Sequence, residues 1–124
     1  MELHDFISWS NATGSANIFA VTGTWTETGI TWANQPTNES INYGVYNVPI
    51  CNTGPGDCAH VTTGFENIVQ RWINGSLVNN GIMITTPATI ASSELDSKES
   101  SHIPYLLVTY RIGGAPYTIG GAGV

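Results

Sequence analysis

The segment YLLVTYR at residues 105–111 shows the pattern that decides the fold. Its side chains alternate between two sets, Leu106, Val108 and Tyr110 against Tyr105, Leu107 and Thr109. Such alternation is typical of a β-strand, in which successive side chains point to opposite faces. The same pattern predicts strands over residues 2–9, 17–22, 41–50 and 81–86, separated by Gly, Asn and Pro. We therefore expect an all-β fold, an antiparallel, jelly-roll-like β-sandwich over residues 1–111.

The segment TGFENIVQRWING at residues 63–75 departs from this pattern. Its apolar residues recur at helical spacing and form one stripe, which consists of Phe65, Ile68, Val69, Trp72 and Ile73. Thr63 followed by Glu66 predicts a capping box at the start, and Asn74-Gly75 predicts a left-handed stop at the end. We expect one short helix that packs this stripe into the core, and not against a cofactor or a partner.

The composition limits the classes of function. The chain has 124 residues, the size of one domain, and three Lys or Arg against nine Asp or Glu give a net charge of −6. Such a chain repels phosphates, so nucleic acid and anionic lipid are not expected as partners. No apolar stretch approaches the roughly 20 residues of a membrane helix, and the start of the sequence lacks the pattern of a signal peptide. The sequence therefore predicts no membrane insertion.

Cys51 and Cys58 bracket the segment CNTGPGDC, whose Gly and Pro residues favour a turn that brings the two sulfur atoms together. We expect a disulfide, which fits an extracellular or cell-surface location. The alternative is a metal site, but tetrahedral zinc needs four ligands and only His60 lies near the two cysteines in the sequence. Candidate glycosylation sites, which fit the same location, are the sequon residues Asn11, Asn38 and Asn74.

Acidic residues are the candidates for chemistry, because the sequence has no nucleophile elbow, HExxH, P-loop or dinucleotide motif. A glycosidase needs two carboxylates about 5 to 10 Å apart. The candidates are Glu27, Glu94, Asp96 and Glu99. The last three lie in the polar run SSELDSKESSH and are weak candidates for structural Ca²⁺, since this run lacks the order of an EF-hand loop. We expect no catalysis and no cofactor beyond that calcium, and we expect surface or edge positions for His4, His60 and His102.

Aromatic rings beside Asn and Thr suit a sugar-binding surface, because the ring contacts the apolar face of a sugar while polar groups bond its hydroxyls. The candidates for this surface are Tyr43, Tyr46 and Trp9. In the first strand, Trp9 is expected to share a face with Leu3 and Ile7. Trp25 and Trp32 are interpreted as core residues, like Trp72.

The C-terminal segment, residues 112–124, is rich in glycine and carries no charge. It repeats Ile-Gly-Gly-Ala at residues 112–115 and 119–122. Two interpretations fit this composition: a flexible linker, or an added strand on a sheet edge. In the second interpretation, Tyr117 and Ile119 are candidates for docking on a neighbouring copy of the chain.

Three ordered motifs resemble the DNRLRE domain family, which includes the repeats of archaeal disaggregatase. TWTETGITWANQP at residues 24–36 is similar to the family's W-T-E-x-x-V-T-W-x-x-x-P motif. VTTGFENIVQRWINGSLVNNGIMI at residues 61–84 is similar to its capped helix and following strand. SSELDSKESSHIPYLLVTY at residues 92–110 is similar to its S-x-E loop, proline and final strand.

The resemblance implies a secreted β-sandwich of microbial surface proteins and polysaccharide-active enzymes, some of them classed as carbohydrate-binding modules, and it does not imply catalysis. The family usually has an arginine where this chain has Ser93. The resemblance therefore does not imply an arginine partner that orients Glu94. Family domains also begin with further strands, so the resemblance implies that this chain is the C-terminal portion of a domain. We therefore expect other polypeptide to cover the apolar residues Leu3, Ile7, Phe19 and Val21.

Two classes of function follow from these observations. The first is a non-catalytic extracellular module of a microbial cell-surface protein, either structural or carbohydrate-binding, whose partner is a polysaccharide. The second is a subunit of an extracellular fibre or sheath, in which neighbouring copies of the chain complete each other's sheets. A third alternative, part of a polysaccharide-degrading enzyme, has less support because no carboxylate pair has a motif around it.

Overall fold

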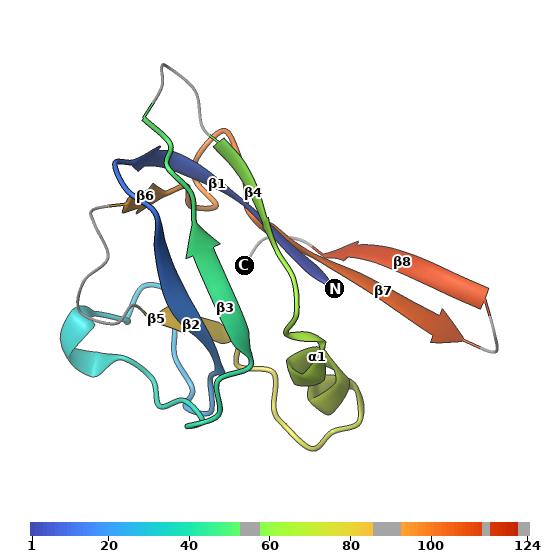
Figure 1. The fold of residues 1–124 in the computed structure, drawn as a ribbon. Coiled ribbons are helices and arrows are strands. Elements are labelled where there is room, and N and C mark those ends of the chain that lie inside the picture. Colours follow the sequence, from blue (N-terminus) through green and yellow to red (C-terminus); the bar gives the residue numbers. More distant parts are fainter. Residues whose placement is uncertain (53–57, 86–92, 113–114, 122–124) are drawn as a thin grey trace.

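Two antiparallel β-sheets form a sandwich in the computed structural model, which describes residues 1–52, 58–85, 93–112 and 115–121 (Figure 1). The first sheet has the order β4-β1-β7-β8, with β6 also paired to β1, and the second has the order β3-β2-β5. The strands are β1 Glu2–Ser10, β2 Gly14–Ala20, β3 Gly44–Val48, β4 Cys58–Thr62, β5 Ile82–Thr85, β6 Ser93–Leu95, β7 Tyr105–Ile112 and β8 Ala115–Gly121. One α-helix, α1, covers Glu66–Ile73. The expected all-β sandwich with one short helix is confirmed.

Inward-facing side chains of both sheets and of the helical segment form one core. Its fully buried apolar members include Ile7, Ile18, Ala20, Phe65 and Ile68. Leu3 and Val21 are also buried, so this chain itself covers these side chains, whereas Phe19 is half-buried. The expectation that other polypeptide covers Leu3, Ile7 and Val21 is therefore wrong, and for Phe19 it stays a prediction.

Burial alternates regularly along β1 as far as Ile7 and then shifts by one residue. The pairing of β1 with β6 is irregular between Ile7 and Trp9. Beyond this point Ser10 is buried, whereas Trp9 is 37% exposed. Side chains alternate between the two faces of a strand, so one extra residue moves every side chain after it to the opposite face. The expectation that Trp9 shares the inward face of Leu3 and Ile7 is therefore wrong.

The apolar stripe around α1 is buried at its start and emerges at its end. Phe65, Ile68 and Val69 are buried, as predicted. Trp72 is half-buried, and Ile73, in the last turn, is 66% exposed. The stripe thus anchors the helix through its first turn, and the prediction that Ile73 packs in the core is wrong.

The two ends of α1 differ from each other in how well the sequence predicts them. The helix begins at Glu66 with Phe65 as N-cap and without a side-chain cap, so the predicted capping box at Thr63 is wrong. Burial of Phe65 sets this start, and the Glu66 carboxylate accepts instead from the Gly64 N–H at 3.3 Å. At the other end, Gly75 adopts a φ of +74° and its N–H donates to the Trp72 carbonyl at 3.2 Å. The predicted left-handed stop is confirmed.

The Cys51–Cys58 disulfide is confirmed, with the two Cα atoms 6.0 Å apart. It connects the first residue of β4 to the residue that forms an isolated bridge with Ser10 of β1. Residues 53–57, over which the sequence predicts a tight turn, lie outside the described residues.

Within the C-terminal segment, residues 115–121 form the strand β8, which fits the interpretation of an added strand. β8 pairs with β7 of the same chain, from Leu106 opposite Gly121 to Ile112 opposite Ala115. Figure 1 shows that the β7–β8 hairpin extends away from the sandwich. The backbones of Tyr117 and Ile119 lie opposite Tyr110 and Val108 of the same chain. The docking of Tyr117 and Ile119 on a neighbouring copy stays a prediction.

Candidate functional site

Residues 24–36 form a compact surface loop, here called the Ω-loop, in the long connection between β2 and β3. Its ends are held together, because the N–H groups of Thr22 and Gly23 both donate to the Thr37 carbonyl, at 2.8 and 3.0 Å. Gly23 permits this approach, since a Cβ there would lie 2.9 Å from the Thr37 nitrogen. Surface loops with closed ends and internal contacts frequently carry function.

Hydrogen bonds inside the Ω-loop fix its shape. A turn directs the N–H groups of Gly29 and Ile30 to the Thr26 carbonyl, each at 3.0 Å. A short 3-10 helix, η1, covers Trp32–Asn34. The Asn34 amide donates to the Gly29 carbonyl at 2.8 Å, and its Oδ1 accepts from the Thr31 hydroxyl at 2.9 Å. The loop is therefore ordered by its own contacts, and a preorganised loop loses less entropy on binding than a mobile one.

A shallow, open hollow of about 310 Å³ lies on the Ω-loop and is lined by Thr24, Trp25, Thr26, Gly29, Ile30 and Asn34. The side chain of Trp25 is 47% exposed, and that of Trp32, on the same loop, is 91% exposed. The Trp25 indole N–H donates to the Asn80 carbonyl at 2.8 Å, and the Asn80 amide donates to the Thr22 carbonyl at 2.9 Å. The turn before β5 thus orients the Trp25 ring. The hollow combines a flat apolar ring with hydroxyl and amide groups.

The interpretation of Trp25 and Trp32 as core residues is wrong. Closure of the chain at Thr22 and Thr37 holds the intervening residues on the surface, and residues 24–35 are all exposed. The sequence contains a signal for this exposure: Thr, Asn, Gln and Gly interrupt the apolar residues, and neither a strand nor a helix period continues through the segment.

The three aromatic residues predicted to contact sugar do not form one surface. Tyr46 is buried and its hydroxyl donates to Asp5, so it presents no ring face to a ligand and its prediction is wrong. Tyr43 is half-buried, and its hydroxyl donates to Glu39. Trp9 is exposed, but it belongs to the first sheet, whereas Tyr43 directly precedes β3 of the second.

An ion pair fastens α1 to the segment before β3. Arg71 Nη1 and Nη2 donate to Glu39 Oε2 and Oε1 at 2.6 and 2.9 Å, and Arg71 also donates to the Tyr43 hydroxyl. The hydrogen bond from Arg71, followed by that from Tyr43, lowers the pKa of Glu39, whereas burial raises the pKa of Tyr43. The Arg71 guanidinium is therefore committed to a contact within the protein.

Lys98 joins the Ω-loop to the segment after β6. Its Nζ lies 2.9 Å from Glu27 Oε1 and 2.9 Å from Glu99 Oε1. The hydrogen bond to Glu99, followed by that to Glu27, raises the pKa of Lys98, and Lys98 in turn lowers the pKa of Glu99. Two of the four glycosidase candidates thus meet at one cation. A general acid of a glycosidase needs a raised pKa, so Glu99 is shifted in the opposite direction.

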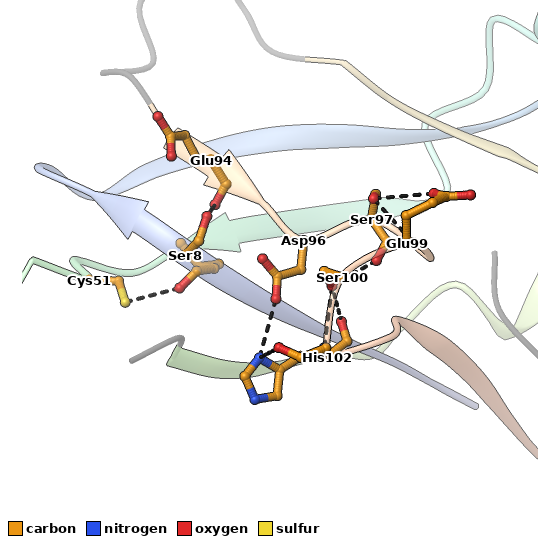
Figure 2. A network of polar contacts seen from close by, with 10 residues as sticks. Ser8, Cys51, Glu94, Asp96, Ser97, Glu99, Ser100 and His102 are labelled. Carbon is orange, nitrogen blue, oxygen red and sulfur yellow. Dashed lines mark hydrogen bonds and ion pairs between the residues drawn. The ribbon is translucent and has the colours of Figure 1, made fainter. Parts of the chain in front are cut away.

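The acidic residues of the predicted calcium site contact different partners (Figure 2). Asp96 Oδ2 lies 3.4 Å from His102 Nδ1, and Glu99 accepts from the Ser97 hydroxyl at 3.3 Å. Glu94 is exposed, and its backbone carbonyl accepts from the Ser8 hydroxyl at 3.2 Å. Within the part of the chain that the structure describes, no three His, Cys, Asp or Glu side chains gather into a possible metal site. Glu94, Asp96 and Glu99 therefore do not form a ligand cluster.

A buried polar cluster, absent from the sequence predictions, joins the two sheets. Asp5 on β1 accepts from the Tyr46 hydroxyl on β3 and lies 2.9 Å from His60 Nδ1 on β4. The rings of Tyr46 and His60 meet edge to face at 4.9 Å. Burial, reinforced by Asp5, raises the pKa of Tyr46, so its hydroxyl remains a donor. Because Asp5 and Tyr46 are buried, the cluster connects the sheets and does not form a binding surface.

The remaining predicted residues lie at or near the surface. The sequon residues Asn11, Asn38 and Asn74 are exposed. His102 is exposed, His4 is half-buried and stacks on Tyr105 with ring centroids 4.6 Å apart, and His60 lies on the edge strand β4.

Among the described residues, no helix has the length and apolar character needed to cross a membrane.

Comparisons of the chain with protein-family models, with curated proteins and with solved structures found no match. The resemblance to the DNRLRE domain therefore stays a prediction from three motifs. The first of these motifs, residues 24–36, coincides with the Ω-loop.

Proposed function

We propose that the chain is a non-catalytic, extracellular β-sandwich module of a microbial cell-surface protein, and that it binds polysaccharide on the Ω-loop. The observation that carries this proposal is the exposure of two indole rings, Trp25 and Trp32, on an ordered loop whose hollow is lined by threonine and asparagine. Sugar recognition needs a flat apolar surface beside polar groups that bond hydroxyls. The Ω-loop provides both.

Three further observations support the proposal. The disulfide fits an oxidising, extracellular environment. The three exposed sequon residues are accessible to glycosylation. Lys98 binds Glu27 and Glu99 and holds the pKa of Glu99 low, an arrangement that suits a binding module better than a glycosidase.

Affinity electrophoresis in gels that contain soluble polysaccharides tests the proposal. The probes are hydroxyethylcellulose, xylan and galactomannan, with the disulfide kept oxidised. We expect Trp32→Ala to weaken binding about tenfold or more, because truncating an aromatic anchor removes the ring contact at a binding site.

Trp9→Ala is the matched control, since it removes an exposed indole from β1, outside the Ω-loop. We expect it to leave the affinity unchanged. Melting temperatures of both variants establish that they fold. Undiminished binding by Trp32→Ala, or loss of binding in Trp9→Ala alone, would contradict the assignment of the Ω-loop as the site.

A second candidate function is assembly of copies of the chain through β8. This strand is the last in the order of its sheet and pairs with β7 along one side, and the hairpin extends from the sandwich (Figure 1). Exposed edge strands of monomeric proteins usually carry charged side chains, whereas residues 112–124 carry no charge. An uncharged edge supports pairing with β8 of a second copy.

Sedimentation velocity over rising protein concentration measures this assembly. We expect dimers or larger species, and we expect Ile119→Lys to return the chain to a monomer, because a charge on an edge strand opposes pairing. Val45→Lys, on the edge strand β3 of the other sheet, is the control. A wild-type monomer at every concentration, or equal effects of the two variants, would overturn the proposal.

A further inference from the structure

We infer that the Ω-loop takes an uncharged polysaccharide and discriminates against acidic ones such as polyuronates. The inference rests on the proposed function and adds the chemical class of the sugar. It comes from the uncharged lining of the hollow and from the ion pairs that engage Lys98 beside the Ω-loop.

A polyuronate needs a cation to balance its carboxylates, and Lys98 is the basic residue that reaches the Ω-loop in the described part of the chain. Its Nζ already lies 2.9 Å from a carboxylate oxygen of Glu27 and 2.9 Å from one of Glu99. To bind an acidic sugar, Lys98 would have to leave these partners. The carboxylates of Glu27 and Glu99 would then lose their cation and add uncompensated negative charge on and beside the Ω-loop, and like charges between partners suppress binding.

The other two basic residues of the chain, Arg71 and Arg111, do not supply the Ω-loop with a cation for an acidic sugar. Arg71 is held by both carboxylate oxygens of Glu39. Arg111 lies on β7 opposite Pro116, in the hairpin that extends away from the sandwich (Figure 1). With a net charge of −6, the chain as a whole also repels a polyanion.

A neutral sugar meets no such obstacle. The hollow presents the Trp25 ring and the Ile30 side chain, which suit the C–H face of a pyranose, beside Thr24, Thr26 and Asn34. Hydroxyl and amide groups bond sugar hydroxyls without an opposing charge. The lining therefore matches the chemistry of an uncharged chain of hydroxylated rings.

The experiment compares hydroxyethylcellulose and galactomannan with polygalacturonate as probes, in affinity electrophoresis of the intact, oxidised chain. The ionic strength is about 10 mM, where the Debye length is about 30 Å and charge effects are largest. We expect at least about tenfold tighter binding to a neutral polymer than to polygalacturonate. Raising the salt to about 0.5 M should leave the affinity for the neutral polymer unchanged, because no ion pair with the ligand is screened.

Glu27→Gln tests the role of the Lys98 ion pairs. Removing one of the two carboxylates is expected to raise the ratio of affinities, polygalacturonate over neutral polymer, about two- to fivefold at low salt, the scale of an exposed charge pair. Glu94→Gln is the control, since it makes the same change of charge at an exposed residue of β6. An equal rise in both variants, or no rise in Glu27→Gln, would overturn the role of this ion pair.

The outcomes separate the inference from the proposed function. Tighter binding of the wild type to polygalacturonate than to every neutral polymer overturns the inference and leaves polysaccharide binding standing. Absence of binding to all of the polymers overturns both. Neutral binding that is lost in Trp32→Ala, with a selective gain in Glu27→Gln, supports both.

Discussion

Replacing Phe65 with alanine is expected to lower the free energy of unfolding by about 3 to 5 kcal/mol. Phe65 has no exposed area, lies at the N-cap of α1 and belongs to the same core cluster as Ile18 and Ile68. The truncation removes buried apolar contacts and leaves a cavity that the two sheets cannot fill completely. Urea unfolding of the oxidised protein measures the loss. We expect a lower midpoint and an unchanged m-value, the slope of the unfolding free energy against urea concentration.

Ile73→Ala is the matched control from the same apolar stripe. Its side chain is 66% exposed, so we expect an effect below about 0.5 kcal/mol. Trp72→Ala should fall between the two, because Trp72 is half-buried. Similar losses for Phe65→Ala and Ile73→Ala would contradict the placement of the helix on the core.

Asp5→Ala is expected to cost about 2 to 5 kcal/mol, through loss of the polar connection between the sheets. The carboxylate receives the Tyr46 hydroxyl and lies 2.9 Å from His60 Nδ1. Without Asp5, the Tyr46 hydroxyl is left in the core without this acceptor, and a buried polar group that loses its partner is costly. Urea unfolding at neutral pH again measures the change.

A double-mutant cycle with Tyr46→Phe checks this reason for the loss. Tyr46→Phe alone leaves Asp5 with His60 and should cost about 1 to 3 kcal/mol. In the double variant the orphaned hydroxyl is gone, so the combined loss should be smaller than the sum of the single losses. Strictly additive losses would show that Asp5 and Tyr46 stabilise the fold independently.

Local sequence patterns were sufficient for the main elements of this fold. Apolar residues recur with a period of two in β1, β2 and β7 and with a helical period in α1. These elements can therefore be predicted from the local sequence alone. The disulfide was predictable because a short segment with Gly and Pro separates Cys51 from Cys58. The strands β4 and β6 were not predicted. β6 is only three residues long, and both strands depend on pairing with β1.

Exposure, in contrast, was decided by contacts between residues distant in the sequence. The bulge in β1 turns Trp9 outward, and the inward position of Asp5 becomes tolerable because Tyr46 and His60 approach it from other strands. For the candidate site the decisive contacts are the backbone bonds of Thr22 and Gly23 to Thr37 and the bond of Trp25 to Asn80. The polar residues that interrupt the apolar ones in this segment indicate exposure, but the closure of the Ω-loop and the contact of Trp25 with the turn before β5 fix where the indole rings lie on the surface.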